Sequence, residues 1–151
     1  ANYLPTWMNI QGLLEMFEDF YNDFDIEKAK EMVGTLNLSM NSRLKTLSKG
    51  NKEKVQLILA MSRKAKVYFL DEPIGGVDPA ARDFILNTII TNYSEDATVV
   101  LSTHLISDIE RVLDEVLFLD RGHLLFHRSV DEIRETEGKS VDQLFREVFR
   151  C

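Results

Sequence analysis

Two adjacent acidic residues, Asp71 and Glu72, directly follow the apolar run from Val67 to Leu70. Four consecutive apolar residues predict a strand buried on both faces, and open α/β sheets place their ligands at the carboxyl ends of such strands. A carboxylate there suits a hard cation such as Mg²⁺, and a second one can orient or deprotonate an attacking water. Two solvated acids that simply end a strand are an equally good interpretation of this run alone.

Three further motifs accompany the acidic pair in a fixed order. Residues 47–51 read Leu-Ser-Lys-Gly-Asn, residues 75–78 read Gly-Gly-Val-Asp, and His104 follows a second apolar run. Together, these motifs resemble those of the ATP-binding cassette (ABC) ATPases over about residues 3–127. Residues 47–51 are similar to the family's LSGGQ signature, residues 67–72 to Walker B with its catalytic glutamate, residues 75–78 to the D-loop, and His104 to the switch histidine.

The resemblance implies a ligand set and a role for each candidate residue. It implies that the full-length protein binds ATP and Mg²⁺, with Asp71 holding the metal, Glu72 acting on the water and His104 touching the γ-phosphate. It assigns the other nucleotide contacts to the signature and the D-loop: Ser48, Lys49, Gly50, Asn51 and Asp78. It also implies a head-to-tail dimer, homomeric or heteromeric, in which the signature of one ATPase subunit completes the site of the other.

The signature motif has a local physical reason. Ser48 and Gly50 are predicted to open a helix that runs to about Ser62, so that the hydroxyl and the free N–H groups of the first turn form an anion site suited to a γ-phosphate. Plain N-capping by Ser48 is an alternative that is compatible with this function. The motif departs from LSGGQ at Lys49, which adds a cation and removes the freedom of a glycine, and at Asn51.

The two later motifs are interpreted in the same way. Asp78 and Pro79 are favoured at the N-cap and first position of a helix, and Gly75 and Gly76 allow the preceding loop to approach another surface closely. A lone histidine after a strand is more often structural than functional. The position of His104, expected at the same sheet edge as the acidic pair, favours the functional interpretation.

The sequence contains no phosphate loop of the form G-x-x-x-x-G-K-S/T, which nucleotide-hydrolysing folds of this type need. Its Gly-Lys-Ser triplet at 138–140 has Ile133 at the first glycine position and follows a capping box at 129–132. We therefore expect the C-terminal portion of a longer protein, inactive by itself. The expected fold class is α/β, a partial P-loop NTPase sheet of the ABC ATPase type with a helical subdomain, lacking the phosphate-loop strand.

Composition restricts the class of protein and its partners. At 151 residues and 44% hydrophobic content, the chain can bury one core and a small helical satellite. Its one cysteine, Cys151, forbids an internal disulfide and suits a reducing compartment. No apolar run approaches the roughly 18 residues of a membrane span, so we expect a cytoplasmic protein that reaches the membrane through a permease subunit. A net charge of −7 argues against nucleic-acid binding.

Periodicity and capping predict three regions: a helical signature subdomain at 9–62, the C-terminal half of the ATPase core at 63–128, and C-terminal helices at 129–151. Strands are expected at 67–70, 98–102, 116–120 and 123–127, and helix N-caps at Asn9, Asp25, Ser129 and Ser140. In the family, the strand that leads into the phosphate loop lies between the second and third of these strands.

Two apolar segments leave alternatives open. Tyr3, Trp7 and Met8 suit either the core or a docking surface for a permease, because the matching segment of transporter ATPases lies near the groove that receives a membrane subunit. The apolar stripe from Val141 to Phe149 suits either packing or dimerisation.

The function that these motifs imply is the ATP-binding and hydrolysing subunit of an ABC transporter. The Leu-Ser-Lys-Gly sequence and residues 3–8 together resemble the bacitracin-exporter type of bacterial transporter ATPase. One alternative is a soluble ABC ATPase in translation or DNA maintenance. Another is a non-catalytic interaction module that never had a phosphate loop, and the sequence upstream of this chain would separate the three.

Overall fold

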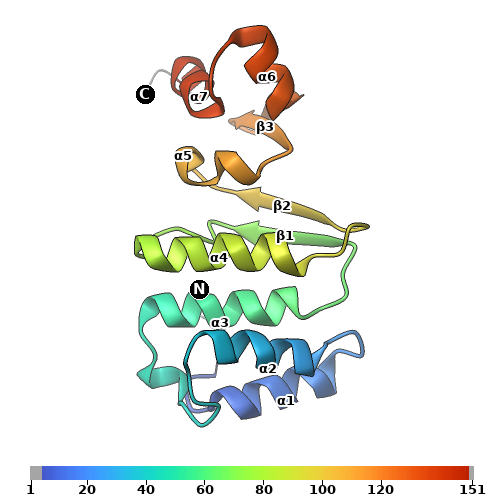
Figure 1. The fold of residues 1–151 in the computed structure, drawn as a ribbon, viewed down its shortest axis with the longest axis vertical. Coiled ribbons are helices and arrows are strands. Elements are labelled where there is room, and N and C mark those ends of the chain that lie inside the picture. Colours follow the sequence, from blue (N-terminus) through green and yellow to red (C-terminus); the bar gives the residue numbers. More distant parts are fainter. Residues whose placement is uncertain (1–4, 150–151) are drawn as a thin grey trace. The chain divides into compact units, whose positions relative to one another are not determined.

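The computed structural model describes residues 5–149 of the 151-residue chain. The chain divides into two compact units, Ala1–Thr103 and His104–Cys151, and each is described by itself below (Figure 1). No helix in the described residues is long and apolar enough to cross a membrane. The three regions predicted from the sequence remain a prediction.

The first unit contains helices and one pair of strands. Its elements are α1 (Ile10–Phe20), α2 (Ile26–Thr35), the short 3₁₀ helix η1 (Leu44–Thr46), α3 (Lys49–Met61), β1 (Val67–Asp71), α4 (Pro79–Asn92) and β2 (Thr98–Ser102). The side chains of Asn9, Asp25, Ser48 and Asp78 each accept a hydrogen bond from the first turn of the helix they precede. These four predicted helix starts are therefore confirmed, and each follows from capping by a short polar side chain.

The four α-helices of the first unit lie on one side of its strand pair (Figure 1). The core between the helices consists of apolar side chains that are almost fully buried: Ile10, Leu13, Leu14, Val33, Leu44, Val55, Ile58, Met61, Ile85 and Leu86. A basic side chain adds a polar link, since Lys28 Nζ donates to the backbone oxygen of Asn92 at 2.6 Å. This bond joins α2 to the carboxyl end of α4, and burial lowers the pKa of Lys28.

Strands β1 and β2 are parallel and pair in register from Val67 with Thr98 to Asp71 with Ser102. The prediction that β1 is buried on both faces is wrong. Tyr68 is buried, but the neighbouring Phe69 is 78% exposed. Alternate side chains of a strand point to opposite faces, and the helices of the first unit lie on only one side of its strand pair.

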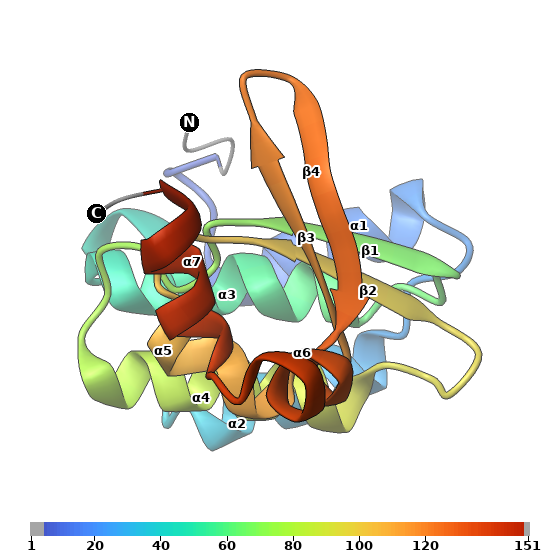
Figure 2. The same cartoon turned by 90° about the horizontal axis from the view of Figure 1, so that it is seen from above.

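The second unit contains a hairpin and short helices. Its elements are α5 (Ile106–Ile109), the 3₁₀ helix η2 (Glu110–Val112), β3 (Glu115–Asp120), β4 (His123–Ser129), α6 (Val130–Glu137) and α7 (Val141–Phe149). Strands β3 and β4 are antiparallel, and Figure 2 shows β4 running directly into α6. The strands of the described residues form two two-stranded sheets, β1 with β2 in the first unit and β3 with β4 in the second.

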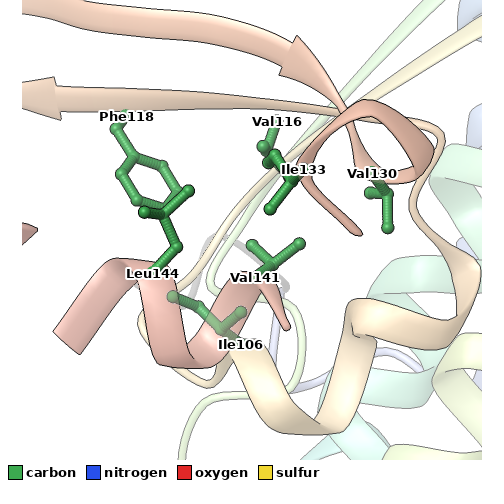
Figure 3. Close-up of a cluster of buried hydrophobic side chains, with 7 residues drawn as sticks. All are labelled: Ile106, Val116, Phe118, Val130, Ile133, Val141 and Leu144. Carbon is green, nitrogen blue, oxygen red and sulfur yellow. The ribbon is translucent and has the colours of Figure 1, made fainter. Parts of the chain in front are cut away.

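The core of the second unit lies between the hairpin and its helices (Figure 3). Its buried members are Ile106, Val116, Phe118, Val130, Ile133, Val141 and Leu144. The apolar stripe of α7 packs into this core, because Phe145 and Phe149 also contact Phe118, with ring centroids 5.5 and 5.8 Å apart. Packing within the unit therefore accounts for most of this stripe.

Both predicted caps of the second unit form. The Ser129 hydroxyl accepts from Glu132 N at 3.0 Å, at the start of α6. Ser140 and Gln143 form a reciprocal pair, in which each side chain accepts from the backbone N–H of the other at 3.1 and 3.0 Å. A second acceptor at the start of α7, which the sequence did not suggest, is the Glu110 carboxylate.

Candidate functional site

Asp71 and Glu72 lie at the carboxyl end of β1, where the parallel pairing brings them beside the end of β2. The Ser102 hydroxyl donates to Asp71 Oδ1, and the Thr103 hydroxyl donates to Glu72 Oε2 at 3.2 Å. The Glu72 N–H donates to the Ser102 oxygen at 2.8 Å, which extends the ladder past the strand end. Both acids are exposed to solvent and are oriented by neighbouring hydroxyl groups.

The backbone of Glu72 adopts a left-handed conformation, with φ of 46°. This conformation costs a residue with a side chain roughly 1 kcal/mol and is concentrated at functional sites. A tight turn maintains it, because Gly75 N donates to the Glu72 oxygen at 3.0 Å. A Cβ atom at position 75 would lie 3.2 Å from that same oxygen, so glycine allows the close approach.

The start of α3 presents the predicted anion-binding groups. The Ser48 hydroxyl accepts from Asn51 N at 3.2 Å, while the first N–H groups of the helix have no partner within it. Gly50 faces the start of α4, since a Cβ atom there would lie 3.7 Å from Asp78 Oδ2 and 3.8 Å from Ala81 Cβ. The structure thus brings the signature residues and Asp78 together within the first unit.

A cavity of about 600 Å³ lies between α3 and the end of β1. Lys49 and Lys52 contribute to its wall from α3, and Phe69, Asp71 and Glu72 contribute from β1 and the residue after it. Cations and carboxylates of the first unit therefore line one solvent-accessible space. This juxtaposition is a result of packing and is not visible in the sequence.

His104 is the first residue of the second unit, and its side chain is exposed. It follows the last residue of β2, Ser102, by two positions, as the sequence analysis expected. Its predicted contact with a γ-phosphate remains a prediction.

The residues at the end of β1 fit a magnesium site in which the protein supplies only some of the ligands. In residues 5–149, no group of three or more His, Cys, Asp or Glu side chains could hold a metal ion by itself. Mg²⁺ commonly takes one or two carboxylates and completes its shell with water and substrate phosphates. The exposed Asp71 carboxylate and the Ser102 hydroxyl next to it offer oxygen ligands of this kind.

A parallel strand pair with acids at its carboxyl end, followed by a loop and a capped helix, is typical of α/β nucleotide-binding proteins. Residues 7–107 match the protein family described as "AAA domain, putative AbiEii toxin, Type IV TA system". The chain therefore belongs to this AAA-domain family. Its curated relatives are ABC transporter ATP-binding proteins, which confirms the resemblance found in the sequence.

The curated relatives include two from Bacillus subtilis (strain 168) that are named for an ABC transporter. The ABC transporter ATP-binding protein YtrB is 27% identical over 124 residues, covering 82% of this chain and 42% of YtrB. The ABC-type transporter ATP-binding protein EcsA is 32% identical over 116 residues, covering 72% of this chain and 47% of EcsA. The chain thus spans less than half the length of these relatives.

Solved structures confirm the predicted fold class. A structure described as the ATP-binding subunit of an ABC transporter superposes with a TM-score of 0.81 at 25% identity, covering 99% of this chain and 65% of that one. The chain therefore has the α/β fold of part of an ABC ATPase.

Proposed function

We propose that this chain is part of the ATP-binding and hydrolysing subunit of an ABC transporter, which couples hydrolysis in a head-to-tail dimer to transport through a permease. The observation that carries the proposal is the pair Asp71 and Glu72 at the end of β1, each held by a hydroxyl from the end of β2. The names of the curated relatives support the same function. The complete protein would lie at the cytoplasmic face of the membrane, without inserting into it.

Each acid has a separate task in this proposal. Asp71 would hold Mg²⁺, which supplies charge neutralisation at the transferred phosphoryl group. Glu72 would accept a proton from the attacking water or orient it, while the Thr103 hydroxyl fixes one of its carboxylate oxygens. The strained backbone of Glu72 contributes by fixing the direction in which the side chain leaves the strand. His104 would contact the γ-phosphate.

The start of α3 would serve the other subunit of the dimer. The free N–H groups after Ser48, the side chains of Lys49 and Asn51, and the backbone of Gly50 would contact the γ-phosphate of ATP bound across the interface. Asp78 would border the same interface, because it lies against Gly50 in this chain. The second subunit can be a copy of the same protein or a different one.

The permease would dock on the apolar surface before α1. Trp7 is 74% exposed, so the interpretation of this residue as core is wrong. A cavity of about 400 Å³, whose wall includes Trp7, Met8 and Arg43, lies beside it and would receive a segment of the membrane subunit. Tyr3, which begins the predicted segment, lies outside the described residues.

The test is Glu72→Gln in the full-length protein that contains this chain. The amide keeps the shape of the side chain and removes the proton acceptor, so we expect ATP binding to persist and hydrolysis to slow by roughly a hundredfold or more. A dimer held by ATP should accumulate on gel filtration. The matched control is Glu95→Gln, which changes an exposed acid in the loop before β2.

Hydrolysis by Glu72→Gln at the rate of wild type would reject the catalytic assignment. The chain of 151 residues by itself should hydrolyse no ATP, because its sequence has no phosphate loop. Turnover near 1 s⁻¹ from the purified chain would contradict this expectation. An upstream sequence without a phosphate loop would instead favour the non-catalytic interaction module.

A further inference from the structure

Two adjacent hydroxyl residues at the end of β2 each contact one of the two acids at the carboxyl end of β1. The Ser102 hydroxyl donates to Asp71 Oδ1, and the Thr103 hydroxyl donates to Glu72 Oε2 at 3.2 Å. The partners of each pair are 31 positions apart, so the parallel register of the two strands creates both contacts. A hydroxyl has a single proton to donate, so each hydroxyl serves a single acid.

The backbone that carries the two hydroxyls is fixed at this point. The Ser102 oxygen accepts from Glu72 N at 2.8 Å, which adds a ladder bond after the last paired residues of the strands. Only one side-chain torsion separates each hydroxyl oxygen from this backbone, and the branched Cβ of threonine restricts that torsion further. The two donors therefore have little freedom to leave the acids.

The contact with Ser102 restricts the orientation of the Asp71 carboxylate. Asp71 and Ser102 are directly opposite each other in the register, so their side chains leave the strand pair on the same face. The terminal torsion of an aspartate is broad, and an exposed carboxylate without a donor samples many orientations. The hydrogen bond to Oδ1 narrows this range and directs a cation to the remaining lone pairs, chiefly those of Oδ2.

The contact with Thr103 acts on the other acid. The left-handed backbone of Glu72 sets the direction in which its side chain leaves the strand, and the Thr103 hydroxyl holds the far end of that side chain. A general base works only within hydrogen-bond reach of the proton that it accepts. The position of the Glu72 carboxylate therefore affects the rate of proton transfer more than the binding of a cation.

We propose that Ser102 and Thr103 are positioning residues with separate tasks. Ser102 sets the affinity of Asp71 for a divalent cation, and Thr103 sets the rate at which Glu72 acts on the attacking water. These roles rest on the proposed function and divide two of its steps between the two hydroxyls. A group that hydrogen-bonds to a metal ligand typically changes metal affinity or activity about 10–100-fold, which makes the first role measurable.

The first experiment measures cation affinity in the absence of hydrolysis. The full-length protein that contains this chain is loaded with the non-hydrolysable ATP analogue AMP-PNP. Mn²⁺, used as the probe for Mg²⁺, is titrated and its free concentration is read by electron paramagnetic resonance. Ser102→Val removes the hydroxyl, whereas Ser102→Thr keeps it on a side chain of the same shape. We expect the Mn²⁺ dissociation constant to rise about tenfold in Ser102→Val and to stay within about twofold of wild type in Ser102→Thr.

The second experiment measures ATP turnover at saturating Mg²⁺. Thr103→Val should lower kcat at least about fivefold, because the base is misplaced, and more Mg²⁺ should not restore it. The loss should be smaller than in Glu72→Gln, since the carboxylate is still present. Thr103→Ser, which keeps the hydroxyl, should stay within about twofold of wild type. Ser102→Val should recover at least about half of the wild-type kcat once Mg²⁺ saturates, and Thr103→Val should bind Mn²⁺ like wild type.

The matched control is Thr98→Val, which removes a hydroxyl from the other end of β2. Thr98 is exposed and lies on the same face of the strand as Ser102. The substitution should change neither Mn²⁺ affinity nor kcat, so it separates the loss of an acid contact from a general effect of valine on the strand. If Ser102→Val does not fold, Ser102→Ala repeats the first experiment with a smaller side chain.

The outcomes distinguish these roles from the proposed function. Equal Mn²⁺ affinity in Ser102→Val and Ser102→Thr would overturn the role of Ser102. Wild-type kcat in Thr103→Val, or its recovery at high Mg²⁺, would overturn the role of Thr103. If Asp71→Asn weakens Mn²⁺ binding and Ser102→Val does not, only the role of Ser102 is rejected. If Asp71→Asn leaves Mn²⁺ binding unchanged, the metal assignment in the proposed function fails, and the role of Ser102 fails with it.

Discussion

The Glu110 carboxylate should contribute strongly to the stability of the second unit. Its two oxygens accept from Val141 N at 3.1 Å and from Asp142 N at 3.4 Å, the first two N–H groups of α7. The Glu110 side chain is only 14% exposed, and Arg134 Nη2 lies 3.6 Å from Oε1. Glu110→Ala therefore leaves two helix N–H groups without their acceptor and an adjacent cation without its partner.

The magnitude follows from capping and the helix dipole. Loss of a side-chain cap costs about 1 kcal/mol, and loss of a negative charge at a helix start costs about 0.3–1 kcal/mol. Since two N–H groups are involved but the second bond is long, we expect Glu110→Ala to lower the free energy of unfolding of this unit by about 2 kcal/mol. Glu110→Gln keeps an acceptor and should lose about half of that.

The assay is urea-dependent hydrogen exchange of peptides from residues 104–149, which reports this unit separately from the first. The matched control is Glu135→Ala, which removes an exposed acid from α6. The same substitution there should change the free energy of unfolding by less than about 0.5 kcal/mol. If Glu110→Ala and Glu135→Ala were equally stable, the carboxylate would not be anchoring α7 and the reasoning would be wrong.

Two further predictions concern the first unit. The buried hydroxyl of Ser62 has no hydrogen-bond partner among the described residues, so Ser62→Ala should stabilise the chain by up to about 1 kcal/mol in urea denaturation, and a loss of stability would indicate a partner. The Arg63 guanidinium, 2.8 Å from Asp23, lowers the pKa of that carboxyl below 3.8. The stabilisation from this pair should therefore be complete above about pH 3.8 and disappear as the pH falls through the lower, folded-state pKa. Asp23→Asn should be less stable than wild type at pH 7 and converge with it in acid, and a difference that is constant with pH would contradict this.

The helix starts could be predicted from the sequence because their causes are local. Asn9, Asp25, Ser48 and Asp78 each cap the helix that follows, and a side chain three residues from its target needs no tertiary structure to find it. The exposure of Phe69 could not be predicted in this way. An apolar run predicts that a strand can be buried, whereas the elements that pack on each face decide whether it is.

The candidate site was predictable in position but not in detail. Strand pairing in register carries Ser102 to Asp71, and hydroxyl residues at the end of the neighbouring apolar run were a usable signal for that contact. The left-handed backbone of Glu72 had no signal, because glutamate rarely adopts it. The closeness of Gly50 to Asp78 depends on how α3 packs beside the start of α4, which only the structure supplies.

The two strand pairs also place different demands on the order of folding. Strands β3 and β4 are joined by the short turn at Arg121 and Gly122, and a hairpin of this kind closes within microseconds. Asp71 and Ser102, in contrast, are 31 positions apart, and the long connection between them, which contains α4, must close for β1 and β2 to align in parallel. Pulsed hydrogen exchange during refolding should therefore detect protection in the hairpin before protection in β1, and the acidic pair should acquire its arrangement late. The reverse order would mean that the parallel pair nucleates folding.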